Sequence, residues 1–313
     1  MMATKALGQL GDFEIKQLKI FKTVVECEGF SAAETELNIS RPTISNHIAN
    51  LESRLNMKLC KRGRGGFALT EEGAVIYDQI TLLLSQLDQF RNTINNLSTS
   101  PSGQLRIAFS DWLSIDERCM LPKIFQQFHR QAPDVELLIE VEHMTAMEKM
   151  VLNNHLDVAI IPYHRRLEGL NYIHLFTDVH YVYCGEEHPL FEVPENEITD
   201  EMVNQHKLIH AGLKPHEEVY QQLSQMNLGG VSYFYEARIA LLLSGCFISF
   251  LPEEIAKPYV EKGQLKAVAK ETKQFLLGVA VISKKSTQPN RAKELFLQTI
   301  GELHHDAEDA PPY

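Results

Sequence analysis

Residues 21–73 read FKTVVECEGFSAAETELNISRPTISNHIANLESRLNMKLCKRGRGGFALTEEG, and this stretch contains the signals for short helices joined by tight turns. Residues 15–27, which overlap the start of this stretch, place apolar side chains at helical spacing, and this predicts an amphipathic helix. Ser31 is then expected to cap a second short helix, and Glu34 lies three residues later, where it would complete a capping box. The stretch therefore predicts a compact helical module at this end of the chain.

A third helix is expected to begin after Ser40, to open with Arg41-Pro42 and to run to Leu55. One face is apolar, with side chains four, three and four residues apart: Ile44, Ile48, Leu51 and Leu55. The opposite face carries polar groups near the helix start: Arg41, Thr43, Ser45, Asn46 and His47. A helix, a tight turn and a second helix with hydrogen-bonding groups at its start form the layout of a helix-turn-helix. Residues 58–70, rich in glycine and basic side chains, predict a hairpin wing that lies along phosphates.

The charge of the chain is unevenly distributed. The net charge is −11, yet residues 1–98 are balanced, with 11 basic and 11 acidic side chains, so the deficit lies in residues 99–313. Residues 38–70 hold six basic side chains against the single acid Glu52. A compact basic segment is what a phosphate-binding surface needs, although a solvated surface cluster would have the same composition.

The composition of the 313 residues is that of a soluble globular protein, with 44% hydrophobic and 23% charged residues, and the length predicts about two domains. No apolar run is long enough for a membrane span, and the N-terminus lacks the features of a signal peptide, so a cytoplasmic location is expected. The five cysteines are widely spaced and form no C-x-x-C pair, which favours reduced thiols over disulfides or a zinc site.

A long helix is predicted after Thr70, which would cap it. Apolar residues then follow a 3-4-3-4-3 spacing, typical of the a/d seam of a coiled coil: Ile80, Leu83, Leu87, Phe90, Ile94 and Leu97. So narrow a stripe needs a partner helix, either in a second copy of the chain or elsewhere in the same chain.

The rest of the chain alternates between short apolar runs and amphipathic stretches, the signature of βαβ units in a parallel sheet. Strands are expected at 104–109, 135–141, 156–161, 206–211, 231–236, 246–252 and 274–282. Helices are expected between them and at 291–303. This pattern predicts two α/β lobes, with the last strand and helix returning to the first lobe.

The N-terminal stretch resembles the LysR-type transcriptional regulators. The resemblance rests on the F-S-x-A-A element near Phe30–Ala33, which reads F-S-A-A here, and on S-x-P-x-[IV]-S at Ser40–Ser45, L-E-x-x-L at Leu51–Leu55 and L-T-x-x-G at Leu69–Gly73. It continues more weakly through Ser244–Pro252. It implies a winged helix-turn-helix DNA-binding domain at 11–70 and a linker and dimerisation helix at 71–98. It further implies a two-lobed, periplasmic-binding-protein-like effector domain at 104–303, with lobe I at about 104–163 and 270–303 and lobe II at about 164–269.

The same resemblance implies partners. These are double-stranded DNA with an inverted repeat, a small-molecule effector between the lobes, a second copy in a homodimer or a dimer of dimers, and RNA polymerase. The residues expected to contact DNA are Ser31, Arg41, Pro42, Thr43, Ser45, Asn46, Arg62 and Arg64. Family members often carry Gln at position 41 and a basic residue at 46, so the DNA sequence that this chain reads should differ.

Residues at strand ends are the candidates for effector contact, because open α/β sheets bind ligands at the carboxyl ends of their strands. They are Ser110, Trp112, Thr145, Tyr163, His210 and Ala211, with Thr145 also expected to cap a helix. A role in the core or as a helix cap is the alternative for each. Carboxylate-sensing relatives carry a basic residue near position 162, where this chain has Pro162, so a ligand held by aromatic and hydrogen-bonding groups is as well supported as a simple carboxylate.

Other chemistries have little support in the sequence. The histidines show no metal-binding spacing, no cofactor motif is present, and G-x-S-x-G is absent, so neither an enzyme nor a metal protein is expected. Cys184 and Cys246 both lie in apolar runs and are expected to be buried and inert. The alternatives are a thiol-based redox-sensing regulator, or a two-lobed small-molecule-binding or enzyme domain with an unrelated helical appendage.

Overall fold

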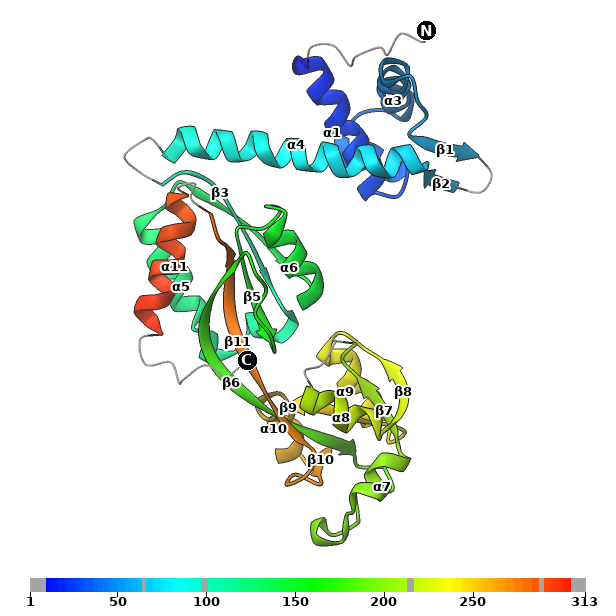
Figure 1. The fold of residues 1–313 in the computed structure, drawn as a ribbon, viewed down its shortest axis with the longest axis vertical. Helices are drawn as coiled ribbons and strands as arrows, with labels where there is room; N and C mark the ends of the chain where they lie inside the picture. Colours follow the sequence, from blue (N-terminus) through cyan, green and yellow to red (C-terminus); the bar gives the residue numbers. More distant parts are fainter. Residues whose placement is uncertain (1–9, 64–65, 97–100, 213–216, 287–289, 305–313) are drawn as a thin grey trace. The chain divides into compact units, whose positions relative to one another are not determined.

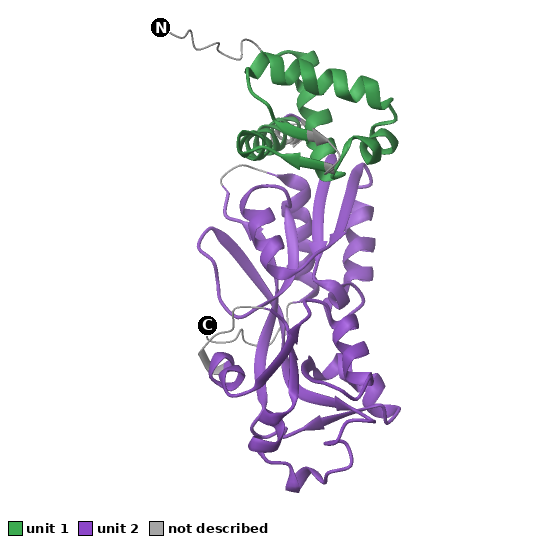
Figure 2. Cartoon of the chain, turned by 90° about the vertical axis from the view of Figure 1, so that its right-hand side faces the viewer, with its two compact units in different colours: residues 1–91 green, residues 92–313 purple. Residues whose placement is uncertain are grey.

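A computed structural model describes residues 10–63, 66–96, 101–212, 217–286 and 290–304. The chain divides into two compact units, residues 1–91 and residues 92–313 (Figure 2), which are taken in turn. Arg64 and Leu97 lie outside the described residues, and the Arg62 side chain is likewise not described.

The first unit packs three helices against a two-stranded hairpin and the start of a long helix (Figure 1). Its elements are α1 Asp12–Glu26, α2 Phe30–Leu37, α3 Arg41–Leu55, β1 Cys60–Gly63, β2 Gly66–Leu69 and α4 Glu71–Asn96. Its core joins the apolar faces of these helices, and Phe21, Val24, Ile44 and Ile48 are completely buried in it. The predicted helices, hairpin wing and linker helix are all present.

The helix boundaries differ from the expectation at one place. α2 begins at Phe30 after Gly29, and no side chain caps it, so Ser31 lies exposed within the helix and the capping box is wrong. Glu34 instead accepts a hydrogen bond from the backbone N–H of Arg41, at the start of α3. Asn38 ends α2 in the left-handed conformation, and Ser40 is the N-cap residue of α3.

The start of α4 is held against the backbone that leads into the wing. The Thr70 hydroxyl donates to the carbonyl of Lys58 at 2.6 Å and accepts from the N–H of Gly73 at 2.9 Å. The backbone N–H of Thr70 donates to the carbonyl of Leu59 at 3.1 Å. The L-T-x-x-G motif is therefore the joint between wing and linker helix.

The stripe of apolar residues along α4 is divided between two environments. Ile80 is only 4% exposed, because it packs in the core of the first unit, and Leu83 and Leu87 lie partly buried against the same core. Phe90 and Ile94, farther along, are 63% and 52% exposed. Only the later part of the predicted seam is thus free of the chain's own module.

The second unit is built on a mixed sheet with the strand order β4-β3-β5-β11-β6-β9-β7-β8 and with β10 paired to β6. The first lobe contains β3 Gly103–Phe109, α5 Leu121–Gln131, β4 Val135–Val141, α6 Met144–Leu152 and β5 Val158–Tyr163. Strand β3 is parallel to β4 and β5, as the βαβ pattern requires. Short 3₁₀ turns at Asp111–Ser114 and Glu117–Cys119 follow β3.

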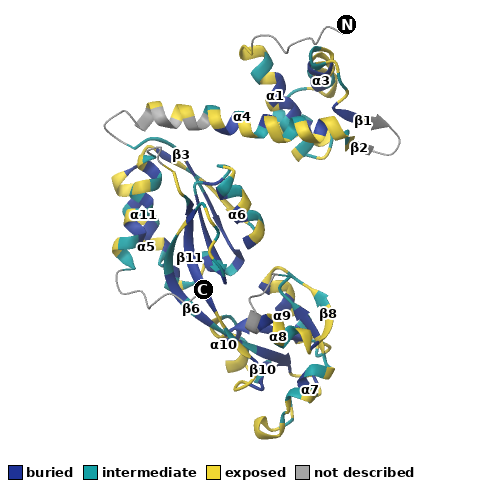
Figure 3. Cartoon of the chain, viewed as in Figure 1, coloured by how far each residue is buried: buried dark blue, intermediate teal, exposed yellow. Residues whose placement is uncertain are grey.

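Two long strands run from one lobe to the other (Figure 1). They are β6 Leu170–Gly185 and β11 Gln274–Lys284, paired antiparallel, and β11 also pairs with β5. α11 Arg291–Leu303 then packs on α5, so the predicted return of the last strand and helix to the first lobe is confirmed. Buried residues follow the strands through both lobes, as Figure 3 shows.

The second lobe is a smaller α/β layer. Its elements are a 3₁₀ turn at Glu195–Glu197, α7 Asp200–Gln205, β7 Lys207–His210, α8 Glu217–Ser224, β8 Asn227–Val231, α9 Tyr235–Leu243, β9 Ile248–Pro252, α10 Glu253–Glu261 and β10 Leu265–Val268. The strand expected at 231–236 is wrong: β8 ends at Val231, and Tyr235 already begins α9. Its backbone N–H donates to the Asp111 carboxylate of the first lobe, a contact that local sequence does not reveal.

Candidate functional site

The first unit presents the polar start of α3 on its surface. Arg41, Pro42, Thr43 and Asn46 are exposed, and Ser45 is half-buried. An open concave surface beside them is lined by residues of α2, α3 and the hairpin, including Ser31, Arg41, Ser45 and Lys61. Three of the sequence-predicted DNA-contact residues therefore lie around one hollow with a basic side chain of the wing.

Buried contacts hold α3 and the wing in fixed relation. Glu52, 4% exposed, forms an ion pair with Lys58 at 2.7 Å and accepts hydrogen bonds from the N–H groups of Leu59 at 3.0 Å and Cys60 at 3.4 Å. Burial acts to raise the pKa of Glu52, but these donors outweigh it, and the pKa lies below its usual value. The single acid of the basic segment therefore has a structural role, and Arg41, Lys58 and Lys61 of the same segment are exposed.

In the second unit the two lobes touch through three aromatic and polar contacts. The Asp111 carboxylate accepts the N–H of Tyr235 at 2.8 Å, and Trp112 packs edge-on against the Tyr235 ring. His143 stacks on Tyr233 with ring centroids 5.2 Å apart. Burial raises the pKa of Asp111, because a charged carboxylate loses solvation there. These contacts lie at the strand ends where the sequence places the effector.

The residues predicted to contact an effector separate into two groups. Ser110 and Ala211 line a small pocket at the lobe junction, together with His143, Pro162, Tyr233 and Arg238. His210 and Ala211 line a second cavity.

The other three predicted effector residues lie elsewhere. Trp112 packs between the lobes against Tyr235. Tyr163 is fully buried, and its hydroxyl pairs with Nδ1 of His174 at 3.1 Å. Thr145 is exposed in the first turn of α6, and the expected cap is wrong because His143 is the N-cap residue.

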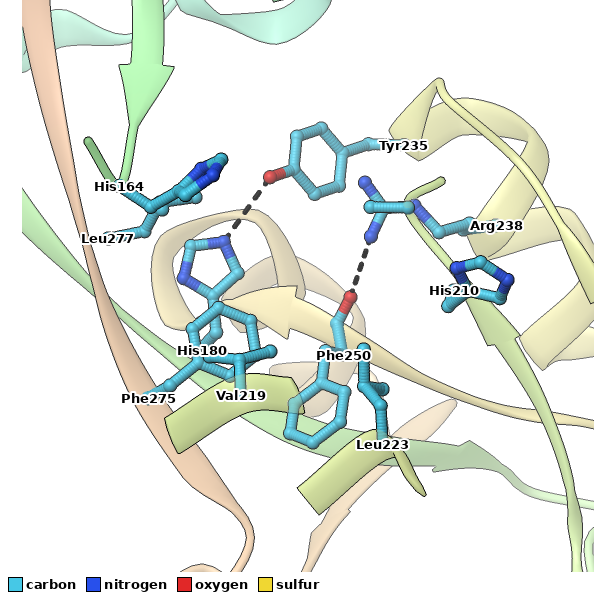
Figure 4. Close-up of a pocket in the computed structure, with 11 residues that line it drawn as sticks. His164, His180, His210, Val219, Leu223, Tyr235, Arg238, Phe250, Phe275 and Leu277 are labelled. Atoms are coloured by element: carbon cyan, nitrogen blue, oxygen red, sulfur yellow. Dashed lines mark hydrogen bonds between the residues drawn. The ribbon is translucent and has the colours of Figure 1, made fainter. Parts of the chain in front are cut away.

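The second cavity is the larger and the more apolar of the two, with about 60 Å³ open to solvent-sized molecules (Figure 4). Phe250, Phe275, Leu277, Val219 and Leu223 supply its apolar wall. Arg238 lies at its edge and is 3% exposed. The sequence analysis missed Arg238, although a lone cation within the apolar helix stretch ARIALLL was the available signal.

Histidines also line this cavity, and burial lowers the pKa of two of them, His180 and His210. His180 is buried and stacks on Phe275 with centroids 4.8 Å apart, and its Nε2 shares a hydrogen bond with the Tyr235 hydroxyl at 3.3 Å. Burial, with the charge of Arg238 as a second cause, lowers the pKa of His180 to about 3. Farther into the second lobe, burial and the neighbouring His206 lower the pKa of His188 to about 4.

These histidines make the second unit sensitive to acid. An unfolded histidine titrates near 6.5, so below that pH the unfolded chain binds protons that the folded unit does not. We expect the free energy of unfolding to fall by about 1.4 kcal/mol per pH unit for each of His180 and His188 as the pH drops from 6.5 toward their folded pKa values. Urea unfolding at pH 7.5, 6.5, 5.5 and 5.0 measures the slope.

His180→Phe, which retains an aromatic ring against Phe275, should remove about half of that slope. The matched control is His129→Gln, since His129 is exposed on α5. A His180→Phe variant with the same pH dependence as the parent chain would show that His180 is not held neutral.

The cysteines give one confirmation and one correction. Cys184 is buried, and burial raises its pKa to about 12. Cys246 is exposed, contrary to expectation, because it follows the turn at Gly245 rather than facing the core of β9. Among the residues that the structure describes, no group of three metal-ligating side chains comes together, and no helix is long and apolar enough to cross a membrane.

The fold and the two sites together define a helix-turn-helix module with a wing, joined by a long helix to a two-lobed ligand-binding domain. The family described as bacterial regulatory helix-turn-helix protein, lysR family, matches residues 15–74, and the LysR substrate binding domain matches residues 98–304. The chain belongs to the LysR family of transcriptional regulators.

Relatives and solved structures agree with this assignment. The chain is 34% identical to the HTH-type transcriptional activator BauR of Pseudomonas aeruginosa over 295 residues, which cover 94% of this chain and 97% of BauR. It is 25% identical to the nitrogen assimilation regulatory protein nac of Escherichia coli over 156 residues, half of each chain. The crystal structure of CbnR, a LysR family transcriptional regulator, shares the fold with a TM-score of 0.63 at 16% identity, covering 94% of this chain and 100% of CbnR.

Proposed function

We propose that this LysR-type regulator reads an inverted-repeat DNA site with the N-terminal half of α3 and changes its activity when a small molecule binds between its lobes. The observation that supports DNA binding is the exposed start of α3. Arg41, Thr43 and Asn46 are directed to solvent, while the apolar face of the same helix is buried in the core of the module. A recognition helix enters the major groove by its N-terminal residues. CbnR, which has the same fold, has been solved in complex with its target DNA.

In this proposal each predicted residue has one of three tasks. Arg41, Thr43, Ser45 and Asn46 face base edges, where arginine pairs with guanine and asparagine with adenine. Pro42 fixes the first turn of α3. Ser31, Arg62 and Arg64 contact phosphates and position the module without reading sequence. The domains are those expected above: DNA-binding at 11–70, linker at 71–98 and effector-binding at 104–303.

The assembly we propose is a homodimer through α4, and a dimer of dimers on DNA. A two-fold axis places two recognition helices on two half-sites, which is why the site should be an inverted repeat. We also propose that the regulator works in the cytoplasm, contacts RNA polymerase and has no enzymatic activity of its own. Ligand binding at the lobe junction shifts the population between two arrangements of the lobes.

Replacing Arg41 by alanine tests the DNA interface. Duplexes enriched from a random pool by the full-length chain should contain an inverted repeat, and Arg41→Ala should bind them about 10 to 100 times more weakly by fluorescence anisotropy. The loss should be much smaller on a duplex of unrelated sequence, because Arg41 reads bases rather than phosphates.

The control is Lys123→Ala, which removes one positive charge from the exposed face of α5 in the second unit. It should bind the enriched duplexes as the parent chain does. Equal affinity of Arg41→Ala and Lys123→Ala for those duplexes would show that the start of α3 is not part of the surface that recognises DNA.

A further inference from the structure

The cavity in Figure 4 is lined by a buried cation, Arg238, whose hydrogen-bonding capacity is only partly used. Nη1 of Arg238 donates to the carbonyl of Phe250 at 2.9 Å, and the guanidinium lies 4.0 Å from the centre of the Tyr235 ring. Nε of Arg238 is buried and has no hydrogen-bond partner. No ion pair joins Arg238 to a carboxylate among the residues whose side chains the structure describes.

An arginine cannot avoid this situation by losing its proton, because a guanidinium stays charged in proteins. A buried charge without a counter-charge costs several kcal/mol, so such a group either has an anion or awaits one. The nearby acid Asp111 is already engaged, since its two oxygens accept the N–H of Tyr235 and the hydroxyl of Ser110. Asp111 and Arg238 attract each other through their charges, but no ion pair joins them among the described side chains, so the carboxylate of a ligand would be the direct partner that Arg238 lacks.

A second donor lies beside Arg238. The backbone N–H of Gly212 donates to Nδ1 of His210 at 3.1 Å, so a neutral His210 carries its proton on Nε2. Burial and the charge of Arg238 lower the pKa of His210, which favours this neutral form. Figure 4 places Arg238 and His210 on one side of the cavity and Phe275 and Leu277 on the other. The cavity thus has a donor end at Arg238 and His210, and an opposite end where Phe275 and Leu277 lie beside His180 and His164.

We propose that this cavity binds a small monocarboxylate whose carboxylate pairs with Arg238 and Nε2 of His210, and whose carbon chain lies against Phe275 and Leu277. Planar bidentate pairing with a carboxylate is the arrangement to which a guanidinium is best suited. The solvent-accessible volume of about 60 Å³ corresponds to roughly four to six water-sized spheres, so the acid is a short one. This inference rests on the proposed function, because it names the chemical class of the effector.

The test compares matched pairs of small molecules on the full-length protein. The acids are straight-chain carboxylates of three to six carbons that end in a methyl, hydroxyl or amino group, and each is paired with its primary amide. We expect at least one acid to raise the melting temperature in a concentration-dependent way while its amide does not, because only the acid supplies the counter-charge. Calorimetric titration then gives the Kd of that acid.

Arg238→Met is the first variant, because it removes the charge and retains an unbranched apolar side chain. It should weaken binding of that acid by about 10- to 100-fold, and its melting temperature without ligand should equal or exceed that of the parent chain, since an unpaired buried charge has been removed. Arg238→Lys, which keeps a point charge without the planar fork, should fall between the two. Lys149→Met, an exposed lysine on α6, is the control and should bind as the parent chain does.

Four results would overturn the proposal: equal binding of an acid and its amide, equal binding of inorganic phosphate, unchanged affinity in Arg238→Met, or no response to any acid of the series. A separate measurement addresses the proposed function. If an acid binds the cavity but changes neither the DNA affinity nor the assembly of the parent chain, the carboxylate site stands and the role of that ligand as effector fails.

Discussion

Replacing Gly73 by alanine lowers the free energy of unfolding of the N-terminal unit by about 3 kcal/mol. A Cβ at this position would lie 1.9 Å from the carbonyl oxygen of Leu59 and 2.8 Å from its carbonyl carbon. Both are backbone atoms of a fully buried residue, so they cannot rotate away as the end of a flexible side chain could. To accommodate the added Cβ, either α4 moves away from the backbone of the wing, or the hydrogen bonds from Thr70 to the carbonyls of Lys58 and Leu59 break.

The matched control is Gly301→Ala in α11, where a Cβ would meet nothing within 4 Å. Because glycine disfavours a helix interior, this substitution should stabilise the second unit by about 0.5–1 kcal/mol. Calorimetric unfolding of the full-length chain measures both effects, and DNA binding of Gly73→Ala should fail at a temperature where Gly301→Ala still binds. A Gly73→Ala variant as stable as the parent chain would mean that the backbone at Leu59 yields easily, and the joint between wing and α4 would not be rigid.

The elements that the sequence predicted well are those whose local signals agree with their packing. The helix at 291–303 has the predicted bounds, since a strong apolar stripe coincides with the side-chain cap of Asn290 at its start. A helix was also expected between the strands at 104–109 and 135–141, and α5 lies there with a proline in its first turn. The start of α3 after Ser40 was predicted for the same reason.

The failures occur where tertiary contacts decide the local structure. The run VSYFYE favours a strand by composition, yet its tyrosine at 235 begins a helix whose first N–H is held by Asp111, 124 residues away. β8 instead includes Gly229 and Gly230, although glycine is disfavoured in strands. The neighbouring strand requires a glycine at position 229, because a Cβ there would lie 2.9 Å from the Cβ of Lys207. The sequence analysis left β6 without an assignment.

The candidate sites show the same division. The polar start of α3 could be predicted because helix periodicity alone separates its two faces. The cavity could not, since its lining comes from β6, β7, α8, α9, β9 and β11, and only the fold brings these together. Arg238 was overlooked because its sequence neighbours are apolar, which is the very setting that makes an unpaired guanidinium costly.

Replacing Phe90 by aspartate should dissociate the proposed dimer. Among the residues that the structure describes, the exposed large apolar side chains of α4 are Val75, Leu82, Phe90 and Ile94. Of the described members of the sequence-derived seam, Phe90 and Ile94 are therefore the two that remain available to a partner helix. The structure adds Val75 and Leu82, which the heptad pattern did not include. A pairing of α4 with its copy would bury Phe90 twice, once from each subunit.

Burial of a phenylalanine contributes about 1.5–3 kcal/mol. The substitution removes two buried phenylalanines from the dimer contact and places two carboxylates in an apolar environment. The free energy of dimer formation should therefore weaken by at least 3 kcal/mol, or about 100-fold or more. Sedimentation should show a shift to monomer in Phe90→Asp, with an unchanged melting temperature for the N-terminal unit, because Phe90 is 63% exposed and lies outside its core. Binding to a single half-site duplex should persist, whereas binding to the inverted repeat should lose its cooperativity. Val260→Asp, which places the same charge on an exposed apolar position of α10, controls for charge alone. A Phe90→Asp chain that sediments as the parent does would exclude α4 as the dimer contact while leaving the recognition surface of α3 untouched.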